Sequence, residues 1–261
     1  CLYIVQSGKL GVFKNSDSLM NSRIIIRRGE LIGELALFTQ APRTANVIAL
    51  RDSILWQLPK QAFDKFFQEH PHLIMPMVKS AMLRLIHPTP HHLSSSEKVL
   101  TLAPAGNASP DPIFVQSIVH QMGVYTSVMH VDINKVKQQF PNLSLDQDLS
   151  RYSPLLEWIE YQERDHQFLV FEPEEKYTPW TQLCLHQADR VIFYANYHDQ
   201  KALNSSEEYV FSSLKNYYRE PLLLLMHNSQ VKLPENSIPW IEGRQVELQH
   251  IRDNNSADLT R

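Results

Sequence analysis

Short apolar runs separated by turn residues fill the first part of the chain. Two alternating runs flank Ser7-Gly8 within residues 1–13, a pattern typical of a β-hairpin. A short strand is predicted at residues 24–26, and residues 46–58 are predicted to form two strands joined by a turn at Arg51-Asp52. Short strands at this spacing indicate a small β-roll.

Helical spacing begins after Pro59. Apolar residues recur every three to four positions in residues 60–69 and again in residues 73–86, so we predict two helices whose Phe and Met stripe packs against the roll. Residues 87–97 are rich in Pro, His and Ser, which is typical of an inter-domain linker. Because residues 87–96 contain no acidic residue and no Cys, we predict no metal site from the linker histidines, His87, His91 and His92.

Strands and helices alternate from Lys98 onward. This alternation indicates βαβ units and a mostly parallel, doubly wound sheet, so residues 98–251 are predicted to form an α/β domain. The predicted strands are residues 99–103, 124–131, 168–171, 191–195 and 222–226, and the predicted helices are residues 113–122, 133–140, 154–164, 179–188 and 205–218.

The segment Ile32–Val47, IGELALFTQAPRTANV, has the composition of a small anion cradle. Gly33 permits a close backbone approach, and one helical turn over residues 34–37 would direct free N–H groups at a phosphate. Arg43 adds a planar charged fork that suits phosphate oxygens. Glu34 would repel a phosphate, but it can accept hydrogen bonds from sugar hydroxyls. Phosphate and sugar together indicate a nucleotide.

This segment resembles the phosphate-binding cassette of the cyclic nucleotide-binding domain. The resemblance includes the spacing from Gly33 to Arg43 and departs mildly at Ile32, where strict binders often have Phe. It implies that Glu34 holds the ribose hydroxyl and that Arg43 holds the cyclic phosphate of cAMP or cGMP. It also implies a β-roll truncated at its N-terminus, over residues 1–86, and further contacts from the Thr44 hydroxyl and from the backbone of Leu35, Ala36 and Ala45.

The α/β domain carries no recognisable catalytic motif. Its first loop, Ala103–Pro112, occupies the place of a phosphate loop, but the sequence has neither G-x-x-x-x-G-K-[ST] nor G-x-G-x-x-G. Asp111 and Asp189 are isolated carboxylates, for which capping or surface roles are expected. Cys184 and His186 lie two positions apart on a predicted helix and therefore do not face each other. We expect a catalytically inert sheet.

The segment Lys176–Ala195, KYTPWTQLCLHQADRVIFYA, is the most distinctive part of this domain. Together with the cassette it resembles the regulatory region of the neuropathy target esterase family of patatin-like phospholipases. The resemblance implies that residues 252–261 lead to a patatin-like domain with a Gly-x-Ser-x-Gly nucleophile, that this domain is a partner within the same parent protein, and that the chain is a fragment. No catalytic residue is transferred, because that motif is absent from these residues.

The overall composition argues against several classes of partner and environment. The 261 residues are 43% hydrophobic with a net charge of -3, so no basic field predicts nucleic-acid binding. Two cysteines make no disulfide framework, and no apolar run has the length of a membrane span. We therefore expect a cytoplasmic chain without cofactor, whose parent is able to associate peripherally with membranes.

The combined prediction is a regulatory, non-enzymatic region that senses a cyclic nucleotide and controls or positions a (lyso)phospholipase. The alternative is a scaffold or interaction module whose nucleotide cassette is vestigial. A nucleotide hydrolase built on the α/β domain is disfavoured, because no phosphate-loop Lys is present. The sequence does not choose between cAMP and cGMP, nor does it indicate the lipid substrate, the oligomeric state or the direction of regulation.

Overall fold

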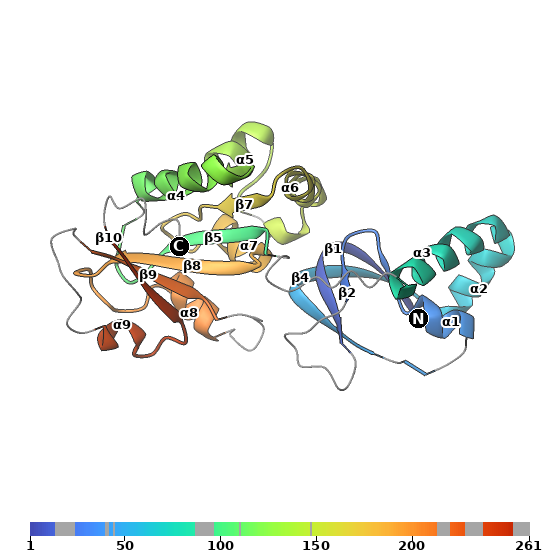
Figure 1. Ribbon diagram of the computed structural model, residues 1–261. Helices are drawn as coiled ribbons and strands as arrows, with labels where there is room; N and C mark the ends of the chain where they lie inside the picture. Colours follow the sequence, from blue (N-terminus) through green and yellow to red (C-terminus); the bar gives the residue numbers. More distant parts are fainter. Residues whose placement is uncertain are drawn as a thin grey trace. The chain divides into compact units, whose positions relative to one another are not determined.

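The computed structural model describes the chain except for residues 14–23, 40–41, 44, 87–96, 110, 147, 213–219, 228–236 and 253–261. The chain divides into two compact units, Cys1–Ser96 and Glu97–Arg261, which Figure 1 shows as a strand-rich unit and an α/β unit. Each unit has a sheet of its own and is described separately below. This agrees with the predicted combination of a β-roll and a doubly wound α/β domain.

The sheet of the first unit is antiparallel and centred on its first strand. That strand pairs on one side with two short strands and along most of its length with the last strand. Val5, Leu10 and Ile26 form its buried apolar cluster. The strands are β1 (Leu2–Phe13), β2 (Ile24–Ile26), β3 (Leu31–Ile32) and β4 (Asn46–Leu58).

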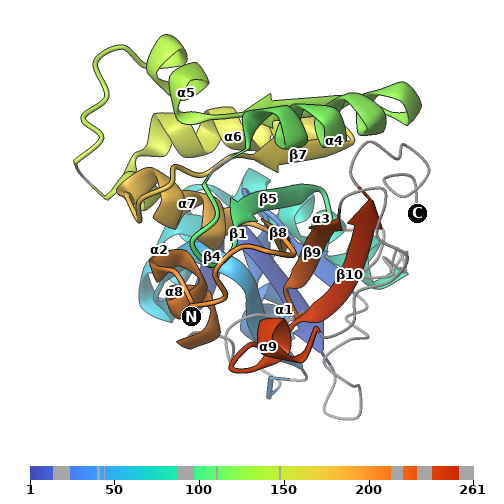
Figure 2. The ribbon, with the colours of Figure 1, turned by 90° about the vertical axis from the view of Figure 1, so that its left-hand side faces the viewer.

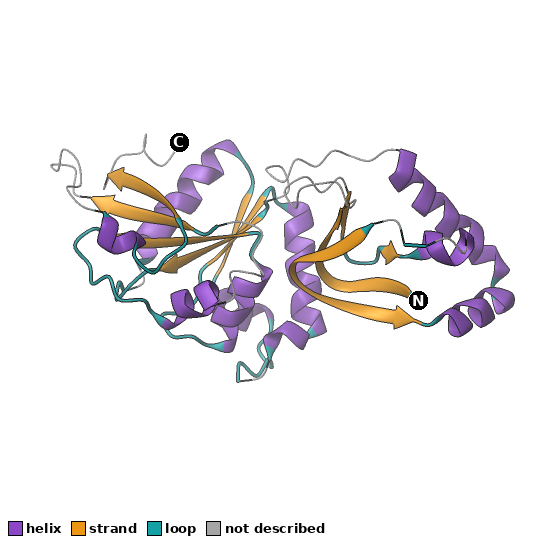
Figure 3. Ribbon diagram, turned by 90° about the horizontal axis from the view of Figure 1, so that it is seen from below, coloured by secondary structure: helices purple, strands orange, loops and turns teal. Residues whose placement is uncertain are grey.

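The two predicted hairpin turns in this unit are wrong. Ser7-Gly8 lies inside the continuous strand β1, and Arg51-Asp52 lies inside the continuous strand β4, where the pairing register shifts. Gly8 has a φ of 98°, and a Cβ there would lie 2.2 Å from Ser53 Oγ. The glycine therefore supports a β-bulge, a feature that shares its sequence signature with a turn. Figure 3 shows the two long strands bending along their length.

The helices that follow confirm the helical spacing. They are α2 (Lys60–Glu69), the 3₁₀ turn η1 (Pro71–Leu73) and α3 (Ile74–Ile86). Phe63 is buried and contacts Phe67 in a tilted arrangement with ring centroids 4.6 Å apart. The predicted packing of the whole Phe and Met stripe holds only in part, because Phe66 and Met82 are exposed.

The second unit has a six-stranded sheet in the order β10-β9-β8-β5-β7-β6, and every pairing in it is parallel. The first strand in the sequence of this unit, β5, lies inside the sheet, with β7 and β6 on one side and β8, β9 and β10 on the other. This is the arrangement of a doubly wound fold. Its strands are β5 (Val99–Pro104), β6 (Val128–Val131), β7 (Phe168–Phe171), β8 (Arg190–Asn196), β9 (Leu222–His227) and β10 (Glu247–Arg252).

Helices cover both faces of this sheet (Figure 2). Helix α4 packs on one face around Val115 and Val170, and α7, α8 and α9 pack on the other around Leu185, Val210 and Trp240. Helix α6 lies beside β7. The helices are α4 (Pro112–Tyr125), α5 (Ile133–Gln139), the 3₁₀ turn η3 (Leu149–Arg151), α6 (Ser153–Asp165), α7 (Pro179–Gln187), α8 (Ser205–Ser212) and α9 (Ile238–Ile241).

Most element ends agree with the predictions to within one or two residues, and the largest difference is at the end of α4. Helix α4 continues through Val124 and Tyr125, so the next strand begins at Val128 rather than at residue 124. Both side chains are exposed at the end of the helix, although β-branched and aromatic residues suit a strand. Helix α8 is described to Ser212, and the rest of its predicted length lies outside the described residues.

Two negative findings concern the described residues alone. No helix in that part of the chain combines the length and apolarity needed to cross a bilayer. No group of three or more His, Cys, Asp or Glu side chains there could hold a metal ion. The linker histidines named above, and most of the linker itself, lie outside this part of the chain.

Candidate functional site

The predicted cassette forms a turn and a short helix. Gly33 follows β3 with a φ of 87°, a conformation that favours glycine, and α1 (Glu34–Thr39) begins at the next residue. The predicted helical turn over residues 34–37 is therefore confirmed. Its first N–H groups have no partner within the helix, so the turn is suited to an anion.

Arg43 lies directly over Gly33. A Cβ built on this glycine would be 1.9 Å from Arg43 Nη1 and 2.7 Å from Cζ, so the guanidinium fills the space that a side chain would take. Arg43 is exposed, and its Nη2 donates a hydrogen bond to the carbonyl oxygen of Cys1 at 2.5 Å. The structure thus brings together the glycine and the cation of the predicted cradle, which are ten positions apart in sequence.

The other cassette residues lie around this pair. Glu34 is 7% exposed at the start of α1, and Ala36 and Ala45 are partly buried. Leu35 belongs to α1, where its backbone continues the turn. Thr44 lies outside the described residues. Nucleotide binding by these residues remains a prediction.

The first loop of the second unit lies at the carboxyl end of β5, where doubly wound sheets bind their ligands. Asp111, near the end of this loop, caps α4, because one carboxylate oxygen accepts from the N–H groups of Ile113 and Phe114 at 3.1 and 3.0 Å. The Asp111 N–H in turn donates to the Tyr194 hydroxyl at 3.2 Å, and burial raises the pKa of Tyr194 to about 12. The expected capping role of Asp111 is confirmed.

Asp189 also has a structural role. One of its carboxylate oxygens accepts from the N–H groups of Lys98 and Val99 at 3.0 and 3.1 Å, at the start of β5. This carboxylate therefore caps the first N–H groups of β5.

Cys184 and His186 do not form a nucleophile–base couple, as predicted. Cys184 is fully buried in α7, and burial raises the pKa of its thiol well above the ordinary value. A neutral buried thiol is a poor nucleophile. The His186 ring stacks against Tyr209 and hydrogen-bonds its hydroxyl through Nε2. The two side chains therefore have separate surroundings.

The distinctive TPW residues, at 178–180, cap α7 and pack in the core of the second unit. Thr178 caps α7 by accepting from the Thr181 N–H at 3.2 Å. Trp180 is buried against Phe171, and its Nε1 donates to the Glu172 carbonyl at 3.0 Å. A satisfied, buried indole indicates a packing role for this residue.

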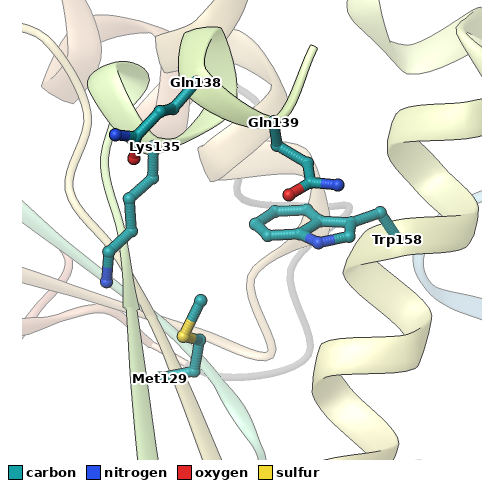
Figure 4. Close-up of a pocket in the computed structure, with 5 residues that line it drawn as sticks. All are labelled: Met129, Lys135, Gln138, Gln139 and Trp158. Atoms are coloured by element: carbon teal, nitrogen blue, oxygen red, sulfur yellow. The ribbon is translucent and has the colours of Figure 1, made fainter.

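A hollow of about 320 Å³ lies between α5, α6 and β6 (Figure 4). Its one charged lining residue, Lys135, donates from Nζ to the His130 carbonyl at 2.6 Å. The remaining lining side chains are amides, a thioether and an indole, none of which is a nucleophile or a general base. We assign no reaction to this hollow. Its other lining residues are Met129, Gln138, Gln139 and Trp158.

Sequence reasoning missed a buried ion pair beside the first loop of the second unit. Arg244 Nε donates to Glu207 Oε1 at 2.7 Å, and the two side chains are 1% and 0% exposed. One local signal was present, since Asn204 and Glu207 have the spacing of a capping box. No pattern indicated the contact with Arg244, which lies 37 positions further along the chain.

Comparison with known families agrees with the two units. Residues 1–70 match the family described as cyclic nucleotide-binding domain. Residues 96–258, more than half of the chain, match the family described as Neuropathy Target Esterase family P-loop like domain. The first match contains the whole cassette, and the second contains the loop that follows β5.

The chain is also similar to curated full-length proteins. It is 25% identical over 265 residues to rat (Rattus norvegicus) patatin-like phospholipase domain-containing protein 7, which covers 94% of this chain and 19% of that protein. It is 23% identical to neuropathy target esterase sws of Drosophila willistoni, over 95% of this chain and 18% of that protein. The chain thus spans about a fifth of each relative's length.

Among solved structures, the cGMP-bound form of the EAL enzyme Bd1971 resembles the chain at 13% identity, over 96% of this chain and 90% of that one. The TM-score is 0.28, which is too low to support an argument about fold or ligand.

Proposed function

Because this chain belongs to the Neuropathy Target Esterase family, we propose that it is the regulatory region of a patatin-like phospholipase and that its first unit binds a cyclic nucleotide. The relatives that it matches carry the names of a patatin-like phospholipase and an esterase, and the matched region is about a fifth of their length. In the proposed role, nucleotide binding controls or positions a hydrolase domain of the parent protein.

The observation that carries this proposal is the position of Arg43 over Gly33. The guanidinium lies at the start of α1, at the glycine whose conformation opens the turn. A cyclic phosphate placed there would meet the Arg43 fork and the first N–H groups of α1 together. The Cys1 carbonyl now accepts from Arg43, and a phosphate oxygen would be the stronger partner because it is charged.

Glu34 completes the proposed contacts through the sugar. Its carboxylate lies next to Gly33 in sequence, at the first position of α1. A carboxylate there is favoured by the helix dipole and is able to accept hydrogen bonds from a ribose hydroxyl. The same group would oppose a second phosphate, so the cradle favours a nucleotide with one phosphate over a triphosphate.

The chain itself is proposed to be non-catalytic. Asp111 and Asp189 cap backbone N–H groups, and Cys184 is buried, so each of these candidate groups has a structural role. An assay of the purified chain with a chromogenic carboxylic ester should give no turnover above the uncatalysed rate. Ester hydrolysis that co-purifies with the chain and saturates with substrate would overturn this part of the proposal.

Thermal melts of the intact chain test nucleotide binding. A ligand at about 100 times its dissociation constant stabilises the state that it binds by about 2.7 kcal/mol. In a domain of this size, 1 kcal/mol shifts the Tm by about 4–8 °C, so cAMP or cGMP at that excess is expected to raise the Tm of the first unit by roughly 10–20 °C.

Two variants make this test specific. Arg43→Ala should abolish the shift, whereas Arg28→Ala removes the same charge from another exposed position of the first unit and should preserve it. A shift of equal size in both variants would rule out Arg43 as the phosphate ligand. The absence of any shift with either nucleotide, in a chain that melts cooperatively, would leave a vestigial cassette and favour the scaffold alternative.

A further inference from the structure

The loop after β5 keeps the shape of an anion cradle although it lacks the phosphate-loop sequence. Gly106 has a φ of 61°, and a Cβ there would lie 2.1 Å from the Gln200 carbonyl oxygen, so the backbone passes very close to the segment that follows β8. Such close approach and a left-handed glycine are the features that let a loop surround a phosphate. The loop also leads directly into α4, as a phosphate loop leads into a helix.

The backbone N–H groups of this loop already have partners inside the protein. Ala105 donates to the Tyr194 carbonyl, Asn107 to the Gln200 carbonyl, and Ala108 to the Ala105 carbonyl. At the start of α4, two more N–H groups are taken by the Asp111 carboxylate. In a phosphate loop such groups point at the ligand. Here the N–H groups of Ala105, Asn107 and Ala108 donate to acceptors within the protein.

The N–H group at the centre of the cradle, that of Gly106, donates to a carboxylate. Gly106 N–H donates to Glu207 Oε2 at 2.7 Å, across 101 positions of sequence. The other oxygen of Glu207 accepts from Arg244 Nε at 2.7 Å. Backbone N–H on one side and a guanidinium on the other are the partners that a bound phosphate oxygen would have.

From this geometry we propose that Glu207 is an internal anion that occupies the former phosphate position of the second unit. The charge of Arg244 balances it, and the pair is almost fully buried. The unit therefore does not take up a nucleotide phosphate at this loop. It contains instead a latent anion site, which becomes available to a small anion such as phosphate, acetate or formate when the carboxylate is removed.

Helix capping alone does not explain the position of Glu207. Its capping box with Asn204 uses one Glu207 oxygen, which accepts from the Asn204 N–H at 3.0 Å, and the Asn204 oxygen, which accepts from the Glu207 N–H at 2.9 Å. A capping box forms equally well at a surface helix. The contacts with Gly106 and Arg244 lie beyond that box, and they bury a charge pair that desolvation makes costly.

Asn204 ties the same loop from the other side. Its Nδ2 donates to the carbonyl oxygens of Pro104 and Gly106, at 2.8 and 3.1 Å. The loop is thus held at its carbonyls by Asn204 and at its central N–H by Glu207. Both residues belong to the first turn of α8 or directly precede it, so one helix start closes the cradle.

Arg244 gives the latent site its second feature. Its side chain is buried, its Nη1 donates to the Trp240 carbonyl at 3.4 Å, and its Nη2 has no hydrogen-bond partner among the described residues. The guanidinium carbon also lies 5.3 Å from the centre of the Trp240 ring. Removal of Glu207 would leave this buried cation without its anion, so the space should acquire affinity for a small anion.

The experiment uses the intact chain in an Arg43→Ala background, so that the first unit does not contribute anion binding. Glu207→Ala is compared with Glu208→Ala, which removes the same charge from the neighbouring exposed position. Melting is followed by tryptophan fluorescence, because three of the four tryptophans lie in the second unit and Trp240 adjoins Arg244.

We expect Glu207→Ala to lower the Tm of the second unit by at least 5 °C and Glu208→Ala to leave it within about 1 °C. Acetate, formate or inorganic phosphate should then raise the Tm of Glu207→Ala saturably, by half or more of the loss. Sodium chloride at equal ionic strength should not. The chain with both Glu207 and Glu208 in place, and the Glu208→Ala variant, should show no saturable anion effect.

A second variant covers the case in which Glu207→Ala does not fold. Glu207→Ala with Arg244→Ala removes the unbalanced cation and should fold more stably than the single variant, with no response to anions. The proposal is overturned if inorganic phosphate or pyrophosphate binds the parent chain saturably in the second unit with Glu207 in place. It is also overturned if Glu207→Ala melts like Glu208→Ala, or if the double variant keeps the anion response. Cyclic nucleotide binding in the first unit does not enter this test.

Discussion

The two units each build a cradle around a left-handed glycine and an arginine. In the first unit, Arg43 is exposed over Gly33 and is held by a carbonyl oxygen. In the second unit, Arg244 is 1% exposed and is held by a buried carboxylate that also takes the Gly106 N–H. Both cradles therefore contain a glycine and an arginine. They differ in the group that accepts a hydrogen bond from the arginine.

This difference shows how an anion site is lost without loss of its backbone shape. A carbonyl oxygen carries only a partial charge, so a phosphate is able to compete for Arg43. A carboxylate that is buried and balanced by its own cation leaves no net charge to attract a ligand. The first cradle is accordingly proposed to sense a nucleotide, and the second to serve as a fixed structural centre.

Arg244→Ala should produce the largest effect. It leaves the Glu207 carboxylate buried without its cation, which costs about 3–5 kcal/mol of unfolding free energy. Denaturant unfolding of the second unit measures this loss. Arg164→Ala removes an arginine whose side chain is 73% exposed and should change stability by no more than about 0.5 kcal/mol. Equal effects of the two substitutions would contradict the central role of the buried pair.

Gly106→Ala should come next. The added Cβ would lie 2.1 Å from a backbone oxygen of Gln200, which cannot rotate away, and the left-handed φ adds a further penalty. Overpacking costs about 1–3 kcal/mol and a left-handed non-glycine residue about 1–2 kcal/mol. We expect a loss of about 2–5 kcal/mol in the second unit. Stability equal to that of the parent would show that the close approach to Gln200 is not required.

Gly33→Ala is the matched change in the first unit and should cost less. Its Cβ would meet Arg43 Nη1, the far end of a flexible side chain that is able to move. The conformational penalty of about 1–2 kcal/mol then remains alone. Because Arg43 is displaced from the cradle, the nucleotide-dependent rise in Tm should also disappear. A loss of stability as large as that of Gly106→Ala would contradict the contrast between a mobile and a fixed neighbour.

Arg43→Ala should have the smallest effect on stability, at most about 0.5 kcal/mol, because the side chain is exposed. Its effect on nucleotide affinity should be large, since it removes the charged fork from the phosphate. Denaturant unfolding without nucleotide and melting with nucleotide separate the two quantities. A large loss of stability without ligand would make Arg43 a structural residue like Arg244.

The local parts of the first cradle, and the starts of several helices, could be predicted from sequence. The spacing of Gly33, the helical turn and Arg43 indicated the first cradle, and the predicted helix starts at residues 133 and 179 agree with α5 and α7. In each case the interacting groups are near one another in the chain, so their geometry follows from local backbone preferences.

The sequence-based predictions were wrong, or missing, where contacts between residues far apart in the sequence determine the structure. Gly8 resembled a turn residue, but its conformation is set by the facing segment at Ser53, 45 positions away. Strand β10, ELQHIR, is polar because it lies at the sheet edge, and α9 is only four residues long, so neither gave a periodic signal. The contact of Glu207 with Gly106 spans 101 positions and left no mark in either segment.

The most direct test of the contrast is a calorimetric titration of the intact chain with cAMP and with cGMP, in the parent, Arg43→Ala and Glu207→Gln forms. We expect one equivalent of cyclic nucleotide bound per chain, lost in Arg43→Ala and retained in Glu207→Gln. Binding that survives in Arg43→Ala, or a second equivalent in the parent chain, would contradict it.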